Sequence, residues 1–262
     1  MTQPSLDLIT QWARAAGAIL LEGFGRDHTL TYKDRNNLQT EMDRRSEAFL
    51  LEQVRAAFPD HRVLAEESGL TEGLMEHYWL IDPLDGTTNY AHGFPMFSVS
   101  IAYAFQGAVQ LGVVYDPVHD ECYSAERGKG AWLNGEPIRV STTDQLINAL
   151  LVTGFPYQIT KPENQKFFTY FQRFATRAQS VRRLGSAALD ACYVAAGRID
   201  GYWQGGVGAW DLAAGALIAS EAGATITRLN GSPDYMAPPY DAVMANPALH
   251  MQMLAVLAEP LD

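Results

Sequence analysis

The stretch WLIDPLDGTTNY, residues 79–90, decides how this chain folds and where its chemistry lies. An apolar run ends here on two aspartates, Asp82 and Asp85, which stand three positions apart around a proline. Because proline fixes one backbone angle and stiffens the turn, the two carboxylates can converge on one point with the Leu84 carbonyl between them. Facing oxygens of this kind attract hard cations.

The residues around these aspartates support two interpretations. Adjacent carboxylates repel each other unless they are protonated or bridged, and Mg²⁺ bridges them through oxygen ligands at about 2.0–2.1 Å. Gly86 lets a backbone N–H approach an anion, and Thr87 adds an N–H and a hydroxyl at an expected helix start, which is typical of a phosphate site. An Asp-Pro-x-Asp-Gly surface turn explains the same residues without any chemistry.

Further acids stand at element boundaries elsewhere in the chain. Glu66 and Glu67 end the preceding strand, Asp211 begins a helix more than a hundred residues later, and Asp43 follows Thr40 by three positions. Each has a structural alternative. Glu66 can be a solvated strand end, Asp211 a helix N-cap, and Asp43 one half of a capping box with Thr40.

Composition limits the classes of function that remain. The 262 residues carry 19 Lys and Arg against 30 Asp and Glu, and no basic cluster occurs that could neutralise a phosphate backbone, so direct nucleic-acid binding is excluded. No apolar stretch is long enough to predict a membrane span, and residues 5–24 are typical of an amphipathic helix rather than a secretory signal. Cys122 and Cys192 lack CxxC spacing, which predicts no disulfide framework and favours a reducing, cytoplasmic setting.

Hydrophobic periodicity predicts an α/β protein with alternating layers of helices and mixed sheets. The first half is expected to contain two helices, two strands that end in acids, and an antiparallel meander: 5–24 and 40–58, then 61–67 and 78–82, then 97–126. In the second half strands are expected to alternate with helices: strands 148–155, 180–185, 198–203, 224–229 and 241–246, and helices 162–179, 187–197 (capped by Ser186), 212–223 (capped by Asp211) and one opening at Asn246-Pro247. Residues 1–262 are predicted to form one domain with a soft division into an α+β half with the metal site, 1–145, and an α/β half, 146–262.

Taken together, these motifs resemble the inositol monophosphatase family of lithium-sensitive, magnesium-dependent phosphatases. The resemblance spans nearly the whole chain and rests on AEES, WLIDPLDGTTNYAHGFP, GVVYDP, ERGKGAWLNGEPIRVS, RRLGSAALDACYVAAGRIDGYW and AWDLAAGALIASEAGA, in the family's order and at similar spacing. A lone DPxDG is a weak signal, whereas DPLDGTTN after a tryptophan-led strand, followed by WDxAAG before a helix, is specific. The resemblance implies the fold shared with fructose-bisphosphatase and Mg²⁺-dependent release of phosphate from myo-inositol monophosphate.

The same resemblance implies a metal site of two or three Mg²⁺ ions. Glu66, Asp82 and the Leu84 carbonyl would hold one ion. Asp82, Asp85 and Asp211 would hold another, so that Asp82 bridges the two. A third, weaker ion would depend on Glu66 and water.

The catalytic residues implied are Asp43, Thr87 and Glu66. Asp43 and Thr87 would orient and deprotonate a metal-activated water that attacks phosphorus directly, without a covalent phosphoenzyme, and a second water would protonate the leaving oxygen. Phosphate oxygens would be bound by the N–H groups of Gly86 and Thr87. His92 is the histidine nearest these motifs, and a lone histidine of this kind is more often structural.

The substrate contacts implied are Asp85, Gly86, Thr87 and Asp211, together with the stretch that lines the polyol, Gly185, Ser186 and Ala187. Lys33 resembles a lysine near the metals when a small gap is allowed. Gln204 departs from the pattern, because inositol-specific members usually carry a glutamate there that accepts hydrogen bonds from substrate hydroxyls. A glutamine still accepts through its carbonyl but also donates.

Several alternatives stay open at this point. The TTN after DPLDG is similar to the inositol branch, but the same chemistry on histidinol phosphate, fructose 1,6-bisphosphate or adenosine 3′,5′-bisphosphate is also compatible. Some bacterial relatives act as partners of the transcription machinery, and a globular protein whose acids have no joint role is a third possibility. The resemblance also implies a homodimer, for which the aromatic meander offers a surface.

Overall fold

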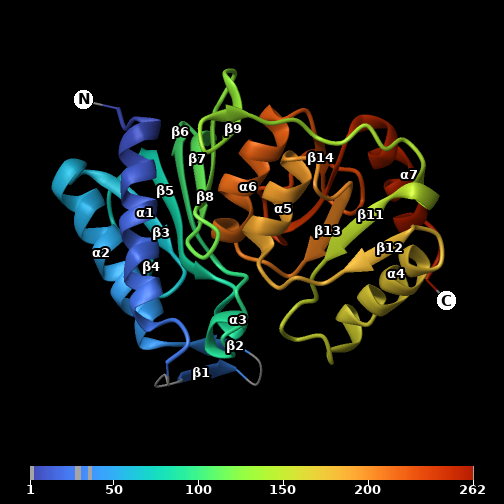
Figure 1. Cartoon of the computed structure of the whole chain (residues 1–262), viewed down its shortest axis with the longest axis horizontal. Coiled ribbons are helices and arrows are strands. Elements are labelled where there is room, and N and C mark those ends of the chain that lie inside the picture. Colours follow the sequence, from blue (N-terminus) through green and yellow to red (C-terminus); the bar gives the residue numbers. More distant parts are fainter. Residues whose placement is uncertain (1–2, 27–30, 35–36, 262) are drawn as a thin grey trace.

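Two capped helices open the part of the chain that the computed structural model describes, residues 3–26, 31–34 and 37–261. Helix α1 (Leu6–Gly23) begins after Ser5, whose Oγ accepts a hydrogen bond from the Leu8 N–H at 3.3 Å. Helix α2 (Glu41–Ala57) begins with a complete capping box between Thr40 and Asp43. Both helices bury one face, as the sequence predicts, and pack on one side of a large sheet (Figure 1).

That sheet has eight strands in the order β10-β9-β8-β7-β6-β5-β3-β4. The neighbours from β5 to β10 are antiparallel, which confirms the predicted meander, whereas β3 runs parallel to β5. Its members are β3 (His61–Ala65), β4 (Gly69–Leu70), β5 (Leu74–Asp85), β6 (Ser98–Phe105), β7 (Ala108–Asp116), β8 (Glu121–Glu126), β9 (Gly130–Leu133) and β10 (Glu136–Pro137). A separate pair, β1 (Thr31–Asp34) and β2 (Asn37–Gln39), lies beside the short helix α3 (Thr87–Ala91).

The second half builds a five-stranded mixed sheet in the order β12-β11-β13-β15-β14. Strand β11 is parallel to both β12 and β13, while β15 is antiparallel to β13 and β14. The strands are β11 (Leu150–Thr153), β12 (Ser180–Arg182), β13 (Gly201–Gly205), β14 (Thr225–Thr227) and β15 (Asp241–Ala245), and the helices are α4 (Lys166–Ala175), α5 (Ala187–Ala195), α6 (Ala209–Glu221) and α7 (Pro247–Leu257).

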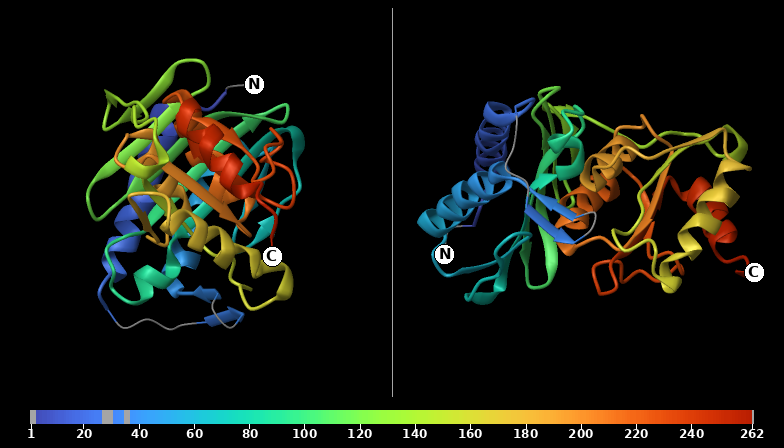
Figure 2. Two further views of the ribbon diagram at one scale, coloured as in Figure 1. Left: turned by 90° about the vertical axis from the view of Figure 1, so that its right-hand side faces the viewer. Right: turned by 90° about the horizontal axis from the view of Figure 1, so that it is seen from below.

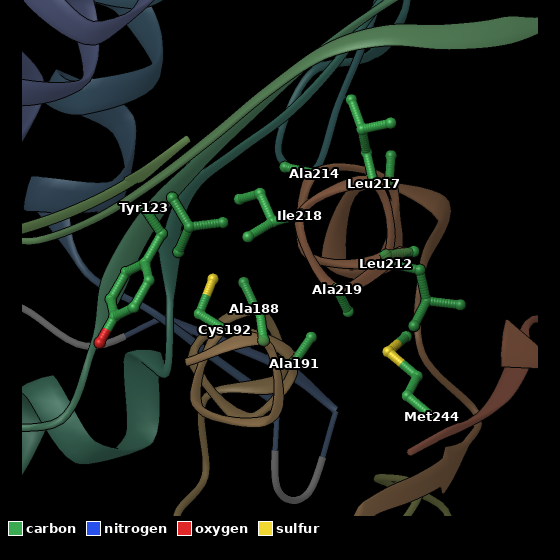
Figure 3. Packing of buried hydrophobic residues seen from close by; sticks show 14 of the residues in the cluster. Tyr123, Ala188, Ala191, Cys192, Leu212, Ala214, Leu217, Ile218, Ala219 and Met244 are labelled. Carbon is green, nitrogen blue, oxygen red and sulfur yellow. The ribbon is translucent and has the colours of Figure 1, made fainter. Parts of the chain in front are cut away.

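Helices α5 and α6 lie between the two sheets, and α4 and α7 cover the outer face of the smaller one (Figures 1 and 2). The layers therefore alternate as helix, sheet, helix, sheet, helix, as predicted. Small side chains such as Ala188, Ala191 and Ala214 fill the central layer (Figure 3) and let the helices approach closely. At Gly112 of β7 a Cβ would lie 3.0 Å from the Ala214 carbonyl oxygen, so a larger residue there would push α6 away from the sheet.

Several predicted boundaries differ from the structure. The strand expected over 78–82 extends from Leu74 to Asp85, and the strand expected over 198–203 covers Gly201–Gly205. The strand expected over 180–185 ends at Arg182, because Gly185 turns the chain with a φ of +92° before α5. The helix expected over 162–179 divides into a 3₁₀ turn (Pro162–Asn164) and α4. The strand expected over 61–67 ends at Ala65.

Asp211 is not the N-cap of α6, contrary to the prediction. The helix begins two residues earlier, at Ala209, and Gly208 in extended conformation is its N-cap. Asp211 is the third helical residue, and its Oδ2 accepts a hydrogen bond from the Gly208 N–H at 2.7 Å. In the described part of the chain, no helix combines the length and the apolar character that crossing a membrane requires.

Candidate active site

The carboxyl end of β5 presents Asp82 and Asp85. Their strand pairs with β6 through Asp82 opposite Ser100 and Asp85 opposite Ser98, with an irregular register between the two pairs. The extra residues form the predicted stiff turn, in which the Leu84 N–H donates to Asp82 Oδ1 at 2.9 Å. Both aspartates are buried, at 1% and 8% exposure, so neither is a solvated surface acid.

Two further acids meet them from other elements. Oxygens of Asp82, Asp85 and Asp211 lie within 4.8 Å of one another, although Asp211 comes from the first turn of α6. Glu66 directly follows β3, which runs parallel to β5 with Ala65 opposite Ile81, so the topology puts Glu66 beside Asp82. The surface-turn interpretation of Asp82 and Asp85 is therefore wrong.

The electrostatics of this cluster favour a bound cation. Burial raises the pKa of Asp82 well above its ordinary value, and the nearby carboxylates of Glu66, Asp85 and Asp211 raise it further. A group of carboxylates that lie this close together in a largely buried position is costly to ionise, because their like charges repel one another. Oxygen-only donors of this kind fit a hard divalent ion such as Mg²⁺.

Asp85 is held from the other half of the chain by the start of α5. Its Oδ2 accepts hydrogen bonds from Ser186 Oγ at 2.6 Å and from the Ala188 N–H at 2.8 Å, and its Oδ1 accepts one from the Ala187 N–H at 3.2 Å. Burial raises the pKa of Asp85, while these three donors oppose the rise by favouring the carboxylate. The helix start thus fixes the orientation of this acid and favours its charged form.

Asp43 and Thr87 form a buried pair behind the acids. Asp43 Oδ2 accepts from the N–H of Thr40 at 2.8 Å and from its Oγ1 at 2.6 Å, which completes the capping box of α2. The other oxygen, Oδ1, lies 3.0 Å from Thr87 Oγ1, which is also 3.0 Å from the Leu84 carbonyl oxygen. The capping role and the contact with Thr87 therefore coexist, because each uses a different carboxylate oxygen.

Gly86 has to be a glycine at this turn. Its φ of +95° is unfavourable for other residues, and a Cβ there would lie 3.0 Å from the Met96 carbonyl oxygen and 3.2 Å from that of Gly185. The turn therefore brings segments from both halves of the chain together at the start of α3.

A cavity of about 910 Å³ opens over this cluster. Its lining combines the acids with residues from both halves: Glu66, Asp82, Leu84, Asp85, Gly86, Thr87, His92, Gly154, Phe155, Tyr157, Arg183, Gly185, Ala187, Gln204, Trp210 and Asp211 are among them. A buried acidic floor and a mixed polar and apolar wall suit a small phosphorylated molecule with bound cations.

Comparisons with known proteins agree with this geometry. The sequence pattern of the Inositol monophosphatase family matches residues 1–261. The chain belongs to the inositol monophosphatase family. It is 44% identical over 236 residues to "Nus factor SuhB" of Pasteurella multocida, which covers 89% of this chain and 88% of that protein. It is 38% identical over 260 residues to "Inositol-1-monophosphatase" of Mesorhizobium japonicum, and the matched segment covers 98% of this chain and 97% of that protein. The solved structure of inositol monophosphatase from Anabaena superposes with a TM-score of 0.86 at 42% identity, covering 98% of this chain and 96% of that one.

In this inositol monophosphatase, most residues predicted from sequence share one cavity. The predicted metal ligands all line it, as do Gly86, Thr87, Gly185, Ala187 and Gln204. Asp43 and Ser186 lie behind the wall, where both are fully buried, and reach the cavity through Thr87 and Asp85. Lys33 falls in β1, but its side chain lies outside what the structure describes.

Arg183 and Tyr202, which lie at or behind this cavity, were not singled out from the sequence. Arg183 lines it with its guanidinium 5.4 Å from the centre of the Phe155 ring, and His92, for which the sequence favoured a structural role, lines it too. Tyr202 lies behind Gln204. A signal existed for Tyr202, because residues two apart in a strand share a face.

In the absence of metal, the inositol monophosphatase is expected to lose stability as pH rises from about 4 to about 6. Burial raises the pKa of Asp43 from 3.8 to about 6, so the folded chain binds more protons than the unfolded chain in that window. Its free energy of unfolding therefore falls as pH rises. Melting temperatures of the EDTA-treated wild type and Asp43→Asn variant, measured from pH about 4 to about 6, check this. Both proteins carry the same surface acids, so the difference between them isolates Asp43. The wild type should lose stability relative to the variant with rising pH; a constant difference would contradict it.

Proposed function

We propose that the protein is a Mg²⁺-dependent phosphomonoesterase that releases phosphate from myo-inositol monophosphate. The observation that carries the proposal is the buried acidic cluster at the floor of the cavity, where Asp82, Asp85 and Asp211 approach within 4.8 Å. Hydrolysis of phosphomonoesters is among the slowest reactions in water, so an enzyme must supply large charge stabilisation. Family membership and a close relative named inositol-1-monophosphatase support the substrate.

The metal ligands proposed are those that the sequence predicts, with two or three Mg²⁺ ions. Glu66, Asp82 and the Leu84 carbonyl would hold one, and Asp82, Asp85 and Asp211 another. Thr87 Oγ1 has one proton, so when it donates to Asp43 the Leu84 carbonyl oxygen keeps its lone pairs for a cation. When bound, the ions supply positive charge that stabilises the attacking and leaving oxygens.

The chain's own residues hold the water and the phosphate. When Thr87 Oγ1 donates its proton to Asp43 Oδ1 at 3.0 Å, its lone pairs are left to accept from a water in the cavity. That water is thereby oriented, and its proton can pass through Thr87 to Asp43. Glu66, which follows the neighbouring parallel strand β3, is proposed to assist at the metal site, and the N–H groups of Gly86 and Thr87 are proposed to bind phosphate oxygens.

The polyol is proposed to lie against Gly185, Ala187 and Gln204, which line the same cavity. Ser186 contributes through Asp85, to which it donates at 2.6 Å. Lys33 stays a prediction as a further contact near the metals.

Phosphate release from a panel of four esters tests this function. The panel contains inositol 1-phosphate, histidinol phosphate, fructose 1,6-bisphosphate and adenosine 3′,5′-bisphosphate, each assayed with Mg²⁺ and with EDTA. We expect Mg²⁺-dependent turnover with inositol 1-phosphate as a good substrate, because the TTN after DPLDG is similar to the inositol branch and Gln204 can still accept a hydrogen bond from a hydroxyl. Activity on only one of the other esters would change the assigned substrate but not the proposed mechanism. No phosphate release from any of the four esters would overturn the proposal.

A partnership with the transcription machinery is a second candidate, because the chain is 44% identical to a protein named "Nus factor SuhB". This role would use the surface of the protein and not the acids in the cavity. Pull-down of transcription components with the wild type and with an Asp85→Asn variant separates the two functions. Equal capture by both proteins supports a surface role, and no capture by either excludes it.

We also propose a homodimer located in the cytoplasm, with lithium inhibition of the phosphatase. Family membership and the reducing environment suggested by Cys122 and Cys192 support these expectations. The molecular mass in solution from light scattering tests the dimer: about 58 kDa, twice the 28.8 kDa of one chain, is expected.

A further inference from the structure

A buried tyrosine fixes the orientation of Gln204 at the cavity. Tyr202 and Gln204 stand two residues apart in β13, so they project from the same face of the sheet. Tyr202 is fully buried, and its hydroxyl donates to Gln204 Oε1 at 3.1 Å. Gln204 is half-buried and lines the cavity over the acidic cluster.

This hydrogen bond determines which end of the amide faces the cavity. A glutamine amide has one acceptor oxygen and one NH₂ group with two donors. In the reverse orientation Nε2 would donate to the tyrosine oxygen, and the hydroxyl proton of Tyr202 would lose the acceptor it has among the described residues. Because an unsatisfied buried donor is costly, the orientation with Oε1 toward Tyr202 is favoured. The NH₂ group is then left for a ligand.

Gly154 also packs against this amide. A Cβ at Gly154 would lie 2.2 Å from Gln204 Oε1 and 2.6 Å from Nε2, so the amide packs directly on the glycine backbone. Contact with this backbone on one side and the tyrosine hydroxyl at its oxygen restrict the amide to a narrow range of positions. A preorganised donor discriminates between ligands better than a mobile one.

A second donor lines the same cavity. Arg183 is exposed, its guanidinium carbon lies 5.4 Å from the centre of the Phe155 ring, and its charge also acts on the buried Asp190. The wall contributed by the second half of the chain thus offers a guanidinium and an NH₂ group. Hydrogen bonds from such groups are strongest when the acceptor is an anion.

We propose that Gln204, positioned by Tyr202, selects phosphomonoesters whose alcohol portion carries a second anionic group, a phosphate or a carboxylate. This inference rests on the phosphatase function proposed above and specifies its substrate class. A hydroxyl oxygen can also accept from Nε2, so inositol 1-phosphate stays a substrate. An ester with a second anion should nevertheless rank above its counterpart with a hydroxyl at the same position.

Two matched pairs of esters test the selection. Glycerol 2-phosphate and 2-phosphoglycerate differ by a carboxylate in place of a CH₂OH group, and fructose 1-phosphate and fructose 1,6-bisphosphate differ by the second phosphate. The measured quantity is the ratio of kcat/KM for the anionic ester to that for its hydroxyl counterpart. The first pair reports on a carboxylate and the second on a phosphate.

The variants are Gln204→Glu and Tyr202→Phe, with Tyr115→Phe as the control. Gln204→Glu replaces the donor with an acceptor and should lower the ratio about 10- to 100-fold. Tyr202→Phe leaves the amide free to turn and should lower it about 3- to 10-fold. Tyr115→Phe removes another buried phenol hydroxyl, one that donates to Asp120 at 3.0 Å away from the cavity, and should leave the ratio unchanged. A general loss of stability would lower kcat/KM for both esters of a pair together and leave their ratio unchanged.

The outcomes separate this inference from the proposed function. If the kcat/KM ratios are the same in the wild type and in both cavity variants, the inference is overturned. Measurable turnover in these assays would still support the proposed phosphatase function. If no ester is hydrolysed, dissociation constants of the same pairs, measured by calorimetry with Ca²⁺ in place of Mg²⁺, decide the question. Tighter binding of the anionic ester that is lost in Gln204→Glu supports the selection, and equal binding overturns it.

Discussion

Replacing Asp82 with asparagine is expected to reduce Mg²⁺-dependent phosphate release to about 1% of the wild-type rate or less. Asp82 stands at the centre of the cluster, with Glu66 beside it and Asp85 and Asp211 within 4.8 Å. Its carboxylate is the one shared by both proposed ions, so its loss weakens both. The metal-free variant should be at least as stable as the wild type, because asparagine stays neutral among the nearby carboxylates without having to bind a proton.

The matched control for Asp82→Asn is Asp116→Asn. Asp116 is another fully buried aspartate of the large sheet, and its Oδ1 accepts from the N–H groups of Val118 and His119 at 2.9 and 3.2 Å. Its Oδ2 lies 2.7 Å from His119 Nδ1. An asparagine can keep both backbone hydrogen bonds, and its NH₂ group can donate to a neutral His119 Nδ1, so most of the activity should remain. Turnover of Asp82→Asn clearly above about 1% of the wild type, at saturating Mg²⁺, would show that this residue is not the shared ligand.

Asp43→Asn is expected to lower kcat about 10²- to 10⁴-fold with little change in KM. The asparagine oxygen would stay with the N–H and hydroxyl of Thr40, because α2 needs that cap. Its NH₂ group would then face Thr87 Oγ1, where Asp43 Oδ1 now lies at 3.0 Å. The hydroxyl would lose the carboxylate that accepts its proton, while the fold and the cavity stay unchanged.

The pair with Thr87 makes this prediction sharper. If Asp43 and Thr87 act as one unit, Thr87→Val and the double variant should show about the same loss of kcat as either single substitution. Steady-state kinetics of the three variants on one ester measures this. Losses that multiply would mean that the two residues act independently and would contradict the proposed proton path.

The acidic cluster could be predicted from sequence because its signal is local. Asp82, Pro83 and Asp85 define a stiff turn by themselves, and apolar runs before Glu66 and Asp82 mark both as strand ends. The topology then brings those ends together, since β3 and β5 are parallel neighbours. Asp43 had two competing interpretations, a capping-box residue and a catalytic partner of Thr87. The capping box and the contact with Thr87 are both present, because the carboxylate has two oxygens with different partners, and the catalytic role stays a prediction.

The rest depends on contacts between segments that are distant in the chain. The start of α6 depends on Gly208, and neither its extended conformation nor the donation of its N–H to Asp211 Oδ2 has a strong propensity signal. The bonds from α5 to Asp85 join residues a hundred positions apart, and no periodicity encodes them. The orientation of the Gln204 amide likewise required the position of the Tyr202 hydroxyl. Sequence thus indicates which groups are present, while packing decides which way they face.

The most direct test is a crystal structure with Mn²⁺ as an anomalous scatterer, since carboxylate and carbonyl oxygens bind Mn²⁺ as they bind Mg²⁺. We expect one anomalous peak in contact with Asp82, Asp85 and Asp211, and a second in contact with Glu66, Asp82 and the Leu84 carbonyl oxygen. Peaks absent from this cluster at saturating Mn²⁺, or found only elsewhere on the protein, would contradict the assignment of these acids as the metal centre of the phosphatase.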